Sequence, residues 1–282
     1  MDADSTADLA DLADVATRTA LFEQVRRHTG IAMNERKWPL LAGRLRRRLY
    51  ALKLSGYDAY LRVLERNADE IPDFVDLVTT NETSFFRTPR IWEYFAQQYL
   101  PRWFAAHAGG TLRIWSAASS SGEEAYTAAM LCEEFRARHP SFQYGIVGTD
   151  IAGAILRKAA RGYFHGRNID TFRLVHPDLF DKYFVADGDG FSIGPALRAR
   201  IQFRKHNLHQ APRDIGPIDF ALLRNVLIYF DVAGQQCVLD NVRRAMVAGG
   251  TLVVGESESL SRFDTEFVFE QPLIYRNAGA HA

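Results

Sequence analysis

Residues 112–126 combine residue types that suit contact with a nucleotide-like ligand. An apolar, aromatic run there ends in six consecutive small residues and a glycine, after which two glutamates open a helix-forming sequence. This is how a buried parallel strand turns into a helix at the carboxyl edge of an α/β sheet, where such ligands bind. The small side chains let a ligand approach the backbone, and the acids accept hydrogen bonds from an amine or a ribose. The alternative is a well-packed turn with no ligand.

The same turn lacks the sequence signatures of two other nucleotide sites. Serines and alanines replace the first glycines of G-x-G-x-x-G, and no G-K-[ST] follows, which argues against a dinucleotide site and against a P-loop. The pattern still suits the looser loop of adenosylmethionine-dependent methyltransferases. It therefore indicates an enzyme with an adenosine-containing cofactor.

Two polar residues stand where other apolar runs end. Asp150 follows the run 144–149, where a carboxylate can accept hydrogen bonds from both ribose hydroxyls. Asn225 follows the run 218–223, and its amide can orient a cofactor or a substrate. Tyr229 comes one helical turn later. The alternatives are an aspartate and an asparagine that cap helices, with a tyrosine in the core.

A third segment, Thr79–Arg90, is polar, then aromatic, then basic. Placed over the sheet edge, its asparagine and threonines would contact a cofactor, and Arg87 would hold a carboxylate. The alternative is a helix start packed by Phe85 and Phe86. The arginines at 44, 46, 47 and 48 are either a solvated helix face or a docking surface for an acidic partner.

The elements that must position these residues fall into two parts. Residues 1–18 read as a flexible acidic N-terminus, and residues 19–90 have the apolar spacing of a helical domain. Leu41, Leu45, Leu49 and Leu52 share one helical stripe. Residues 91–110 are expected to form a linker helix, and 111–282 an α/β domain.

Within the second part, apolar runs alternate with helical segments. Strands are expected at 111–116, 144–149, 218–223 and 250–255, and a helix at Glu123–Arg138. Residues 162–205 break the alternation and are interpreted as an inserted β-rich subdomain, with a hairpin at D-G-D-G 187–190. A closing hairpin is expected over 267–276. The predicted fold class is α+β, with a helical N-terminal domain and a Rossmann-like domain that carries a small antiparallel insertion.

Bulk composition is that of a globular protein, with 47% hydrophobic and 24% charged residues and a net charge of zero. No global charge points to nucleic acid or membrane. The two cysteines have no CxxC or metal-ligand spacing, so a reducing compartment is expected, and no metal site is predicted. No signal peptide or long apolar run is evident, so we expect a cytoplasmic protein without membrane insertion. We also expect a monomer.

Five motifs in order closely resemble the CheR-type chemotaxis receptor methyltransferases over about residues 20–276. They are N-E-T-S-F-F-R, W-S-A-A-S-S-S-G-E-E-A-Y, G-T-D-I, H-N-L and L-L-R-N-V-L-I-Y-F-D, and G-E-S-E-S-L also fits. The resemblance implies transfer of a methyl group from S-adenosylmethionine to a glutamate of a receptor's cytoplasmic helices. S-adenosylhomocysteine and a glutamyl methyl ester would be the products.

By position, the resemblance also implies site residues. The expected cofactor contacts are Asn81, Thr83, Arg87, Glu124, Asp150, Asn207, Leu208, Asn225 and Val226. Arg87 and Tyr229 match the residues nearest the transferred methyl, and Glu123 is the weaker candidate of the two acids. Arg44, Arg46, Arg47 and Arg48 would form the receptor-docking surface.

The chain departs from the family pattern in the insertion. Some members carry a second active-site arginine after a Tyr-Phe pair, but here Val185 and Ala186 follow Tyr183 and Phe184. Pentapeptide dependence is therefore open. Two alternatives for function also stay open, namely a methyltransferase of this fold with another acceptor, and a non-catalytic signalling module that binds the cofactor or its product.

Overall fold

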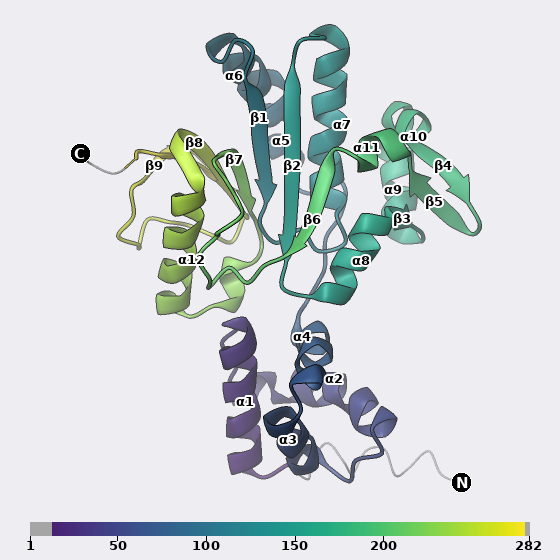
Figure 1. The fold of residues 1–282 in the computed structure, drawn as a ribbon, viewed down its shortest axis with the longest axis vertical. Coiled ribbons are helices and arrows are strands. Elements are labelled where there is room, and N and C mark those ends of the chain that lie inside the picture. Colours follow the sequence, from purple (N-terminus) through teal and green to yellow (C-terminus); the bar gives the residue numbers. More distant parts are fainter. Residues whose placement is uncertain (1–12, 280–282) are drawn as a thin grey trace. The chain divides into compact units, whose positions relative to one another are not determined.

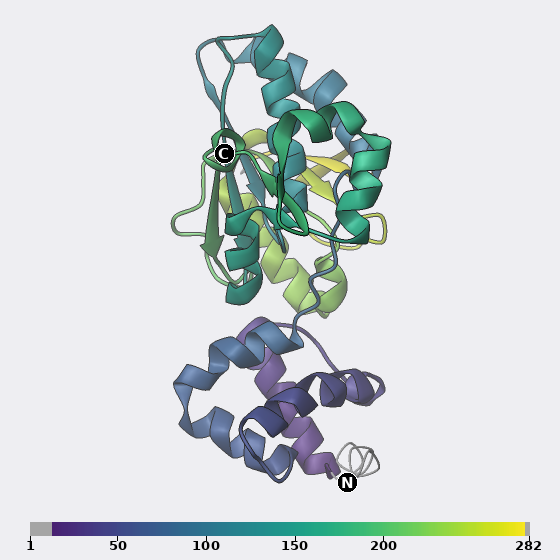
Figure 2. The ribbon, with the colours of Figure 1, turned by 90° about the vertical axis from the view of Figure 1, so that its right-hand side faces the viewer.

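The computed structural model describes residues 13–279, and within them the contacts divide the chain into two units. The first unit holds the described residues up to Thr80 together with Tyr229–Gly234, and the second holds the remainder. Figures 1 and 2 show the helical first unit and the sheet of the second. The described residues contain no helix both long and apolar enough to span a membrane.

The first unit is a helical bundle around one apolar core. Its longer helices are α1 (Val15–Thr29), α2 (Trp38–Ala51), α3 (Tyr57–Arg66) and α4 (Ile71–Val78), with short 3-10 turns at Glu35–Lys37 and Ala68–Glu70. The predicted stripe on α2 is confirmed, because Leu41, Leu45 and Leu49 are buried and Leu52 packs against the same core. The predicted acidic N-terminus falls mostly outside the described residues, but 15–18 are helical because Asp14 caps α1 through Thr17 N–H.

The second unit has a seven-stranded sheet in the order β6-β2-β1-β7-β8-β10-β9. Its strands are β1 (Thr111–Ser116), β2 (Gln143–Asp150), β6 (Ile201–Lys205), β7 (Ile218–Leu223), β8 (Met246–Val254), β9 (Phe267–Gln271) and β10 (Ile274–Asn277). The first five are parallel, and β9 and β10 form the predicted closing hairpin. Together with the helical unit and the small second sheet, this confirms the predicted fold class.

Helices connect these strands as in a doubly wound sheet. The predicted helix α7 (Glu123–Arg138) is confirmed, and its inward alanines, Cys132 and Phe135 are buried. It packs on β2, whereas α8 (Gly153–Arg161) packs on β6 and β2, and α12 (Val232–Ala245) connects β7 to β8. Both cysteines are free thiols.

The expected linker helix over 91–110 is instead part of the second unit. It consists of α5 (Pro89–Tyr94), a π-helical turn (Phe95–Tyr99) and α6 (Leu100–Ala106). Phe95 and Tyr99 pack against Phe220 of β7, with ring centroids 4.8 and 4.5 Å away. The contacts divide the chain at Thr80 and not at residue 90, because 81–90 already belong to the second unit.

The insertion between α8 and β6 is more helical than the sequence predicts. It contains α9 (Arg167–Val175), α10 (Pro177–Tyr183) and α11 (Pro195–Arg198) beside the antiparallel strands β3 (Tyr163–Phe164), β4 (Phe184–Asp187) and β5 (Gly190–Ile193). The hairpin predicted at 187–190 joins β4 to β5. Residues 201–205 were wrongly placed in the insertion, because they pair in parallel with β2 as strand β6 of the main sheet.

Candidate active site

The sheet changes direction between β1 and β7. From β1 the chain moves outward through β2 to β6, and it then returns to β7 on the other side of β1 before continuing to β8. Loops that leave β1 and β7 at their carboxyl ends therefore diverge, and ligands of open α/β sheets bind in the opening this creates. The predicted cofactor residues in the second unit lie at or after the carboxyl ends of β1, β2, β6 and β7, or in the segment that precedes α5.

Ser120 connects two of the predicted cofactor motifs. Its backbone N–H donates to Oδ2 of Asp150 at 2.9 Å, and its hydroxyl donates to the carbonyl of Asn81 at 2.8 Å. Oδ1 of Asp150 accepts from the backbone N–H of Ala152 at 3.0 Å. Ala152 is the N-cap residue of α8, and it makes no side-chain capping hydrogen bond. Asp150 thus shapes the loop after β1 in addition to closing the turn before α8.

Glu124 lies in a buried ion pair that the sequence does not reveal. One carboxylate oxygen accepts from the Ser116 hydroxyl at 2.7 Å, and the other accepts from Nη1 of Arg224 at 2.9 Å. Burial raises the pKa of Glu124, and the charge of Arg224 lowers it by less, so the pKa lies above its ordinary value. The pair joins the first turn of α7 to the residue after β7, and Ser116 connects it to the end of β1.

Arg224 also fixes the segment that carries Arg87. Its Nη2 donates to the Arg87 carbonyl at 2.7 Å, and the indole N–H of Trp92 donates to the same carbonyl at 3.0 Å. The Arg87 side chain is half-buried and donates to the Glu82 carbonyl at 3.2 Å. The backbone of Arg87 is therefore held by two side chains, while its guanidinium retains further donors for a carboxylate.

Asn225 begins a tight turn that is organised by Glu258. Glu258 is buried, and its carboxylate accepts from the backbone N–H groups of Asn225, Val226 and Leu227 at 2.8–2.9 Å and of Gly255 at 2.6 Å. A Cβ at Gly255 would lie 2.8 Å from the Asn225 nitrogen, so only glycine allows this approach. Bonds to an ionised acceptor are the strong class, so this turn is firmly held.

Backbone strain is concentrated in these same loops. Among the described residues, six non-glycine positions have a positive φ, and four of them lie in the candidate site: Phe86, Thr88, Ser120 and Asn225. Such conformations cost of order 1–3 kcal/mol each and persist only where surrounding contacts impose them. The contacts of Ser120, Arg224 and Glu258 described above supply that constraint.

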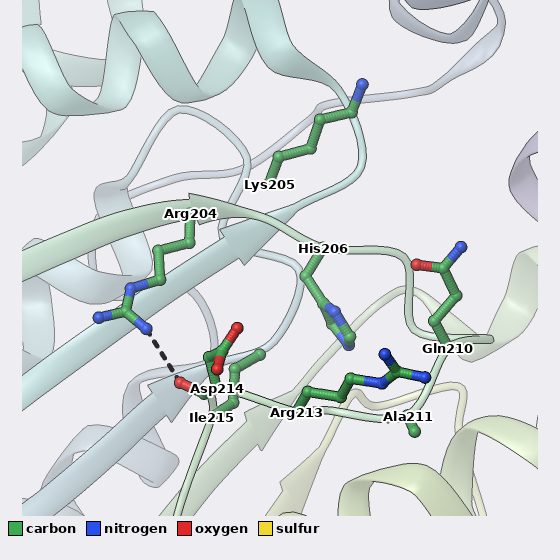
Figure 3. A pocket seen from close by; sticks show the side chains of 8 residues that line it. All are labelled: Arg204, Lys205, His206, Gln210, Ala211, Arg213, Asp214 and Ile215. Atoms are coloured by element: carbon green, nitrogen blue, oxygen red, sulfur yellow. Dashed lines mark hydrogen bonds between the residues drawn. The ribbon is translucent and has the colours of Figure 1, made fainter.

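Asn207 and Leu208 lie in the loop after β6, which runs beside Asp150. The neighbouring His206 N–H donates to the Asp150 carbonyl at 2.9 Å. Asn207 Oδ1 accepts from His209 N–H at 3.0 Å, and the Leu208 carbonyl accepts from the Asn241 amide at 2.9 Å. A basic cleft adjoins this loop, as Figure 3 shows, lined by Arg204, Lys205, His206, Gln210, Ala211, Arg213, Asp214 and Ile215.

Tyr229 belongs to the helical unit by its contacts. It ends the 3-10 turn Leu227–Tyr229, and its carbonyl accepts from Ala32 N–H at 2.9 Å. Burial lowers the pKa of the half-buried Arg44, and the neighbouring Tyr229 partly offsets this shift. A role for Tyr229 beside the transferred methyl stays a prediction.

The four arginines predicted to dock a receptor differ in their surroundings. Arg48 makes a bidentate contact to Glu70 and also pairs with Asp73. Arg44 donates to the Val78 carbonyl and to the Thr80 hydroxyl, and Arg46 is half-buried beside Tyr57. Only Arg47 of the four is exposed. The docking role stays a prediction, and of the four arginines Arg47 is the best placed to contact a receptor.

Three buried charged residues at the site were missed by sequence reasoning or rated low. Glu123 accepts from the Ser121 hydroxyl at 2.6 Å and from the Asn168 amide at 2.9 Å, and Arg224 and Glu258 bind as described above. The signal for Arg224 and Glu258 was their place inside the motifs L-L-R-N-V and G-E-S-E-S-L. Their partners lie 100 and about 30 residues away, so spacing alone does not identify them.

Comparison with known proteins decides the family. The profile described as "CheR methyltransferase, SAM binding domain" matches residues 81–273, and "CheR methyltransferase, all-alpha domain" matches residues 18–79. The chain belongs to the CheR methyltransferase family. Chemotaxis protein methyltransferase 1 of Pseudomonas aeruginosa is 32% identical over 88% of this chain and 92% of its own length. Chemotaxis protein methyltransferase 1 of Vibrio cholerae is 33% identical over 84% and 87%, respectively.

This CheR-family chain is accordingly an S-adenosylmethionine-dependent methyltransferase, as the sequence predicted. The structure fits such a cofactor, because Asp150 at the end of β2, Asn225 at the end of β7 and the Asn81 segment converge on one sheet edge. The profile boundary between residues 79 and 81 also coincides with the division of the contacts at Thr80.

Proposed function

We propose that this protein transfers the methyl group of S-adenosylmethionine to glutamate side chains in the cytoplasmic helices of chemoreceptors. Ser120 carries the proposal, because it connects the predicted ribose ligand Asp150 to the Asn81–Arg87 segment through hydrogen bonds of 2.9 and 2.8 Å. The names of the relatives support a role in chemotaxis. The proposed products are S-adenosylhomocysteine and a glutamyl methyl ester.

The chemistry needs alignment more than proton transfer. When bound, the cofactor supplies a methyl group on a positively charged sulfur, and a glutamate carboxylate is already ionised near pH 7. The chain must therefore orient an acceptor oxygen in line with that methyl and exclude water. Positioning of this kind lowers a barrier by about 7–11 kcal/mol.

We assign the orientation of the acceptor to Arg87 and Tyr229. Arg224 and Trp92 hold the Arg87 backbone in place through hydrogen bonds to its carbonyl. The half-buried Arg87 side chain therefore starts from a fixed position when its guanidinium binds a carboxylate. It must not bind that carboxylate too tightly, since a strong ion pair would lower its nucleophilicity. The proposed cofactor contacts are Arg87 itself together with Asn81, Thr83, Glu124, Asp150, Asn207, Leu208, Asn225 and Val226.

Methyl transfer to a purified receptor cytoplasmic fragment tests these roles. Arg87→Ala and Tyr229→Phe are expected to reduce turnover by at least about tenfold, consistent with the loss of one orienting contact, and to leave the fold intact. Wild-type turnover in either variant would remove that residue from the mechanism. No turnover in the wild-type protein, with cofactor binding retained, would favour the non-catalytic signalling module.

A further inference from the structure

The segment that carries Asn81, Thr83 and Arg87 is packed against the inserted subdomain. The Phe85 ring lies 4.9 Å from both Phe164 and Phe172 and 5.6 Å from Phe184, all of which belong to the insertion. Phe86 adds a stacked contact to His176, at 4.1 Å between ring centroids. Both rings of this cofactor segment are thus held by residues from outside the main sheet.

One side chain of the insertion bonds directly to the cofactor segment. Asn168, on α9, uses its amide nitrogen to donate to the Thr83 carbonyl at 3.2 Å and to Oε1 of Glu123 at 2.9 Å. An amide NH2 has two hydrogens, so these two bonds use both of its donors. Oε2 of Glu123 accepts from Ser121, in the loop after β1. Asn168 therefore joins three parts of the candidate site.

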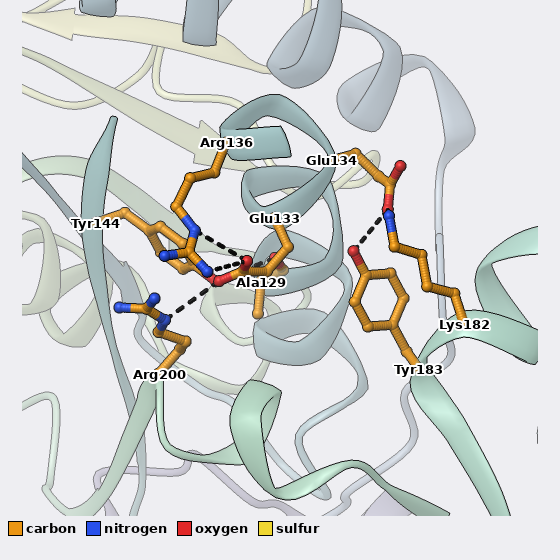
Figure 4. Close-up of polar contacts among 8 residues, drawn as sticks. All are labelled: Ala129, Glu133, Glu134, Arg136, Tyr144, Lys182, Tyr183 and Arg200. Atoms are coloured by element: carbon orange, nitrogen blue, oxygen red, sulfur yellow. Dashed lines mark hydrogen bonds and ion pairs between the residues drawn. The ribbon is translucent and has the colours of Figure 1, made fainter. Parts of the chain in front are cut away.

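The insertion is also fastened to the other end of α7. Glu134 accepts from Lys182 and from Tyr183, each at 2.6 Å, as Figure 4 shows. Two anchors, at Glu123 and Glu134, fix the insertion along this helix. Asn168 itself lies on helix α9 and not in a loop.

We propose that Asn168 is a positioning residue that holds the Thr83 segment against Glu123 and so sets the affinity for the methyl donor. In this role the inserted subdomain completes the cofactor site. The inference rests on the proposed function only in that the site binds this cofactor, and its test therefore measures binding and not methyl transfer to a receptor.

The contact between Glu123 and Asn168 predicts a pH dependence of cofactor binding in a variant that carries an acid at position 168. Burial raises the pKa of Glu123, although its bonds to Ser121 and Asn168 lower it in part. In Asn168→Asp a second carboxyl group would lie beside Glu123, and two carboxylates at one site repel unless one is protonated. Lowering the pH would add that proton and restore a hydrogen bond between the two groups.

The experiment measures the dissociation constant of S-adenosylhomocysteine between pH 6 and pH 9, together with the unfolding temperature of the free protein. Asn168→Ala is expected to weaken binding about tenfold, or ~1.4 kcal/mol, at every pH. Asn168→Asp should bind progressively better as the pH falls. Thr171→Ala is the matched control, because the Thr171 hydroxyl donates to the Arg167 carbonyl within the same helix.

Two results would overturn the proposal. One is an affinity of Asn168→Ala within a factor of about two of wild type, a change below ~0.5 kcal/mol. The other is a pH profile of Asn168→Asp that matches the profile of Asn168→Ala. The profile of Asn168→Asp is compared with that of Asn168→Ala, so a loss of stability common to both variants would not imitate the expected pH dependence. A wild-type protein that binds S-adenosylhomocysteine but does not methylate a receptor would count against the proposed substrate and not against this inference.

Discussion

Glu124 shows how a residue predicted to bind the cofactor also holds the fold together. Both of its carboxylate oxygens are hydrogen-bonded, one to Ser116 and one to Arg224, and the Arg224 side chain is only 2% exposed. Each oxygen retains acceptor capacity for a ligand. Removing the carboxylate would leave a guanidinium deep in the protein without its counter-ion.

We therefore expect Glu124→Ala to lower the free energy of unfolding of the cofactor-free protein by about 3–5 kcal/mol. Urea unfolding measures this value. Combining Glu124→Ala with Arg224→Met removes the unpaired charge and should recover part of the loss. If the cofactor-free protein were as stable without Glu124 as with it, the ion pair would have no structural role.

Secondary elements with strong periodicity were predictable, and elements whose identity depends on distant partners were not. The α7 helix and the β9–β10 hairpin follow from local apolar spacing and turn residues. Strand β6 has only five residues, and its pairing with β2 spans the whole insertion, so local pattern did not separate it from the subdomain. The π-helical turn at Phe95–Tyr99 likewise has no periodic signature.

The candidate site likewise has residues that could be predicted from the sequence and contacts that could not. Asp150 and Asn225 stand at strand ends, where topology alone brings polar residues together. The contacts that shape the site, such as Glu258 with the Asn225 turn or Asn168 with Thr83, join backbone groups to side chains far along the chain. Such pairings cannot be predicted from amino-acid type and spacing.

The contact between Arg48 of helix α2 and Glu70 gives a pH-dependent test. Burial raises the pKa of Glu70, but the bonds from Arg48 and Tyr60 and the charge of Arg48 together bring it below its ordinary value. A carboxylate with a lowered pKa stabilises the folded state above its unfolded pKa, and that contribution is lost as the pH falls through the folded pKa.

The difference in unfolding free energy between wild type and Glu70→Gln should therefore be constant above about pH 5.5, where an ordinary glutamate is ionised. This difference should shrink as the pH falls below the ordinary pKa of glutamate. Urea unfolding at pH 6 and pH 4 measures the change. Asp58→Asn, in an exposed pair with Arg62, is the control. A difference that stays the same at both pH values would show that Glu70 has no lowered pKa.

The helical unit is expected to provide the surface that binds an acidic receptor helix. Arg47 is the exposed arginine of α2, whereas Arg48 forms ion pairs with Glu70 and Asp73. Surface charges of this kind act mainly on association and are screened by salt.

Arg47→Glu should raise the KM for a receptor fragment several-fold at low ionic strength and less at physiological salt, without changing the affinity for S-adenosylhomocysteine. Arg66→Glu makes the same charge change at an exposed site on α3. Equal effects of the two variants would show that net charge matters and that α2 is not a docking surface.

The proposed function of this protein is the methylation of receptor glutamates. The most direct measurement incubates the purified protein with methyl-labelled S-adenosylmethionine and a receptor cytoplasmic fragment, and then maps the label by mass spectrometry before and after alkali. Label on glutamate side chains that alkali releases is the predicted result, and Arg87→Ala should greatly reduce it. Alkali-stable label, or label on another residue type or another acceptor, would contradict the account.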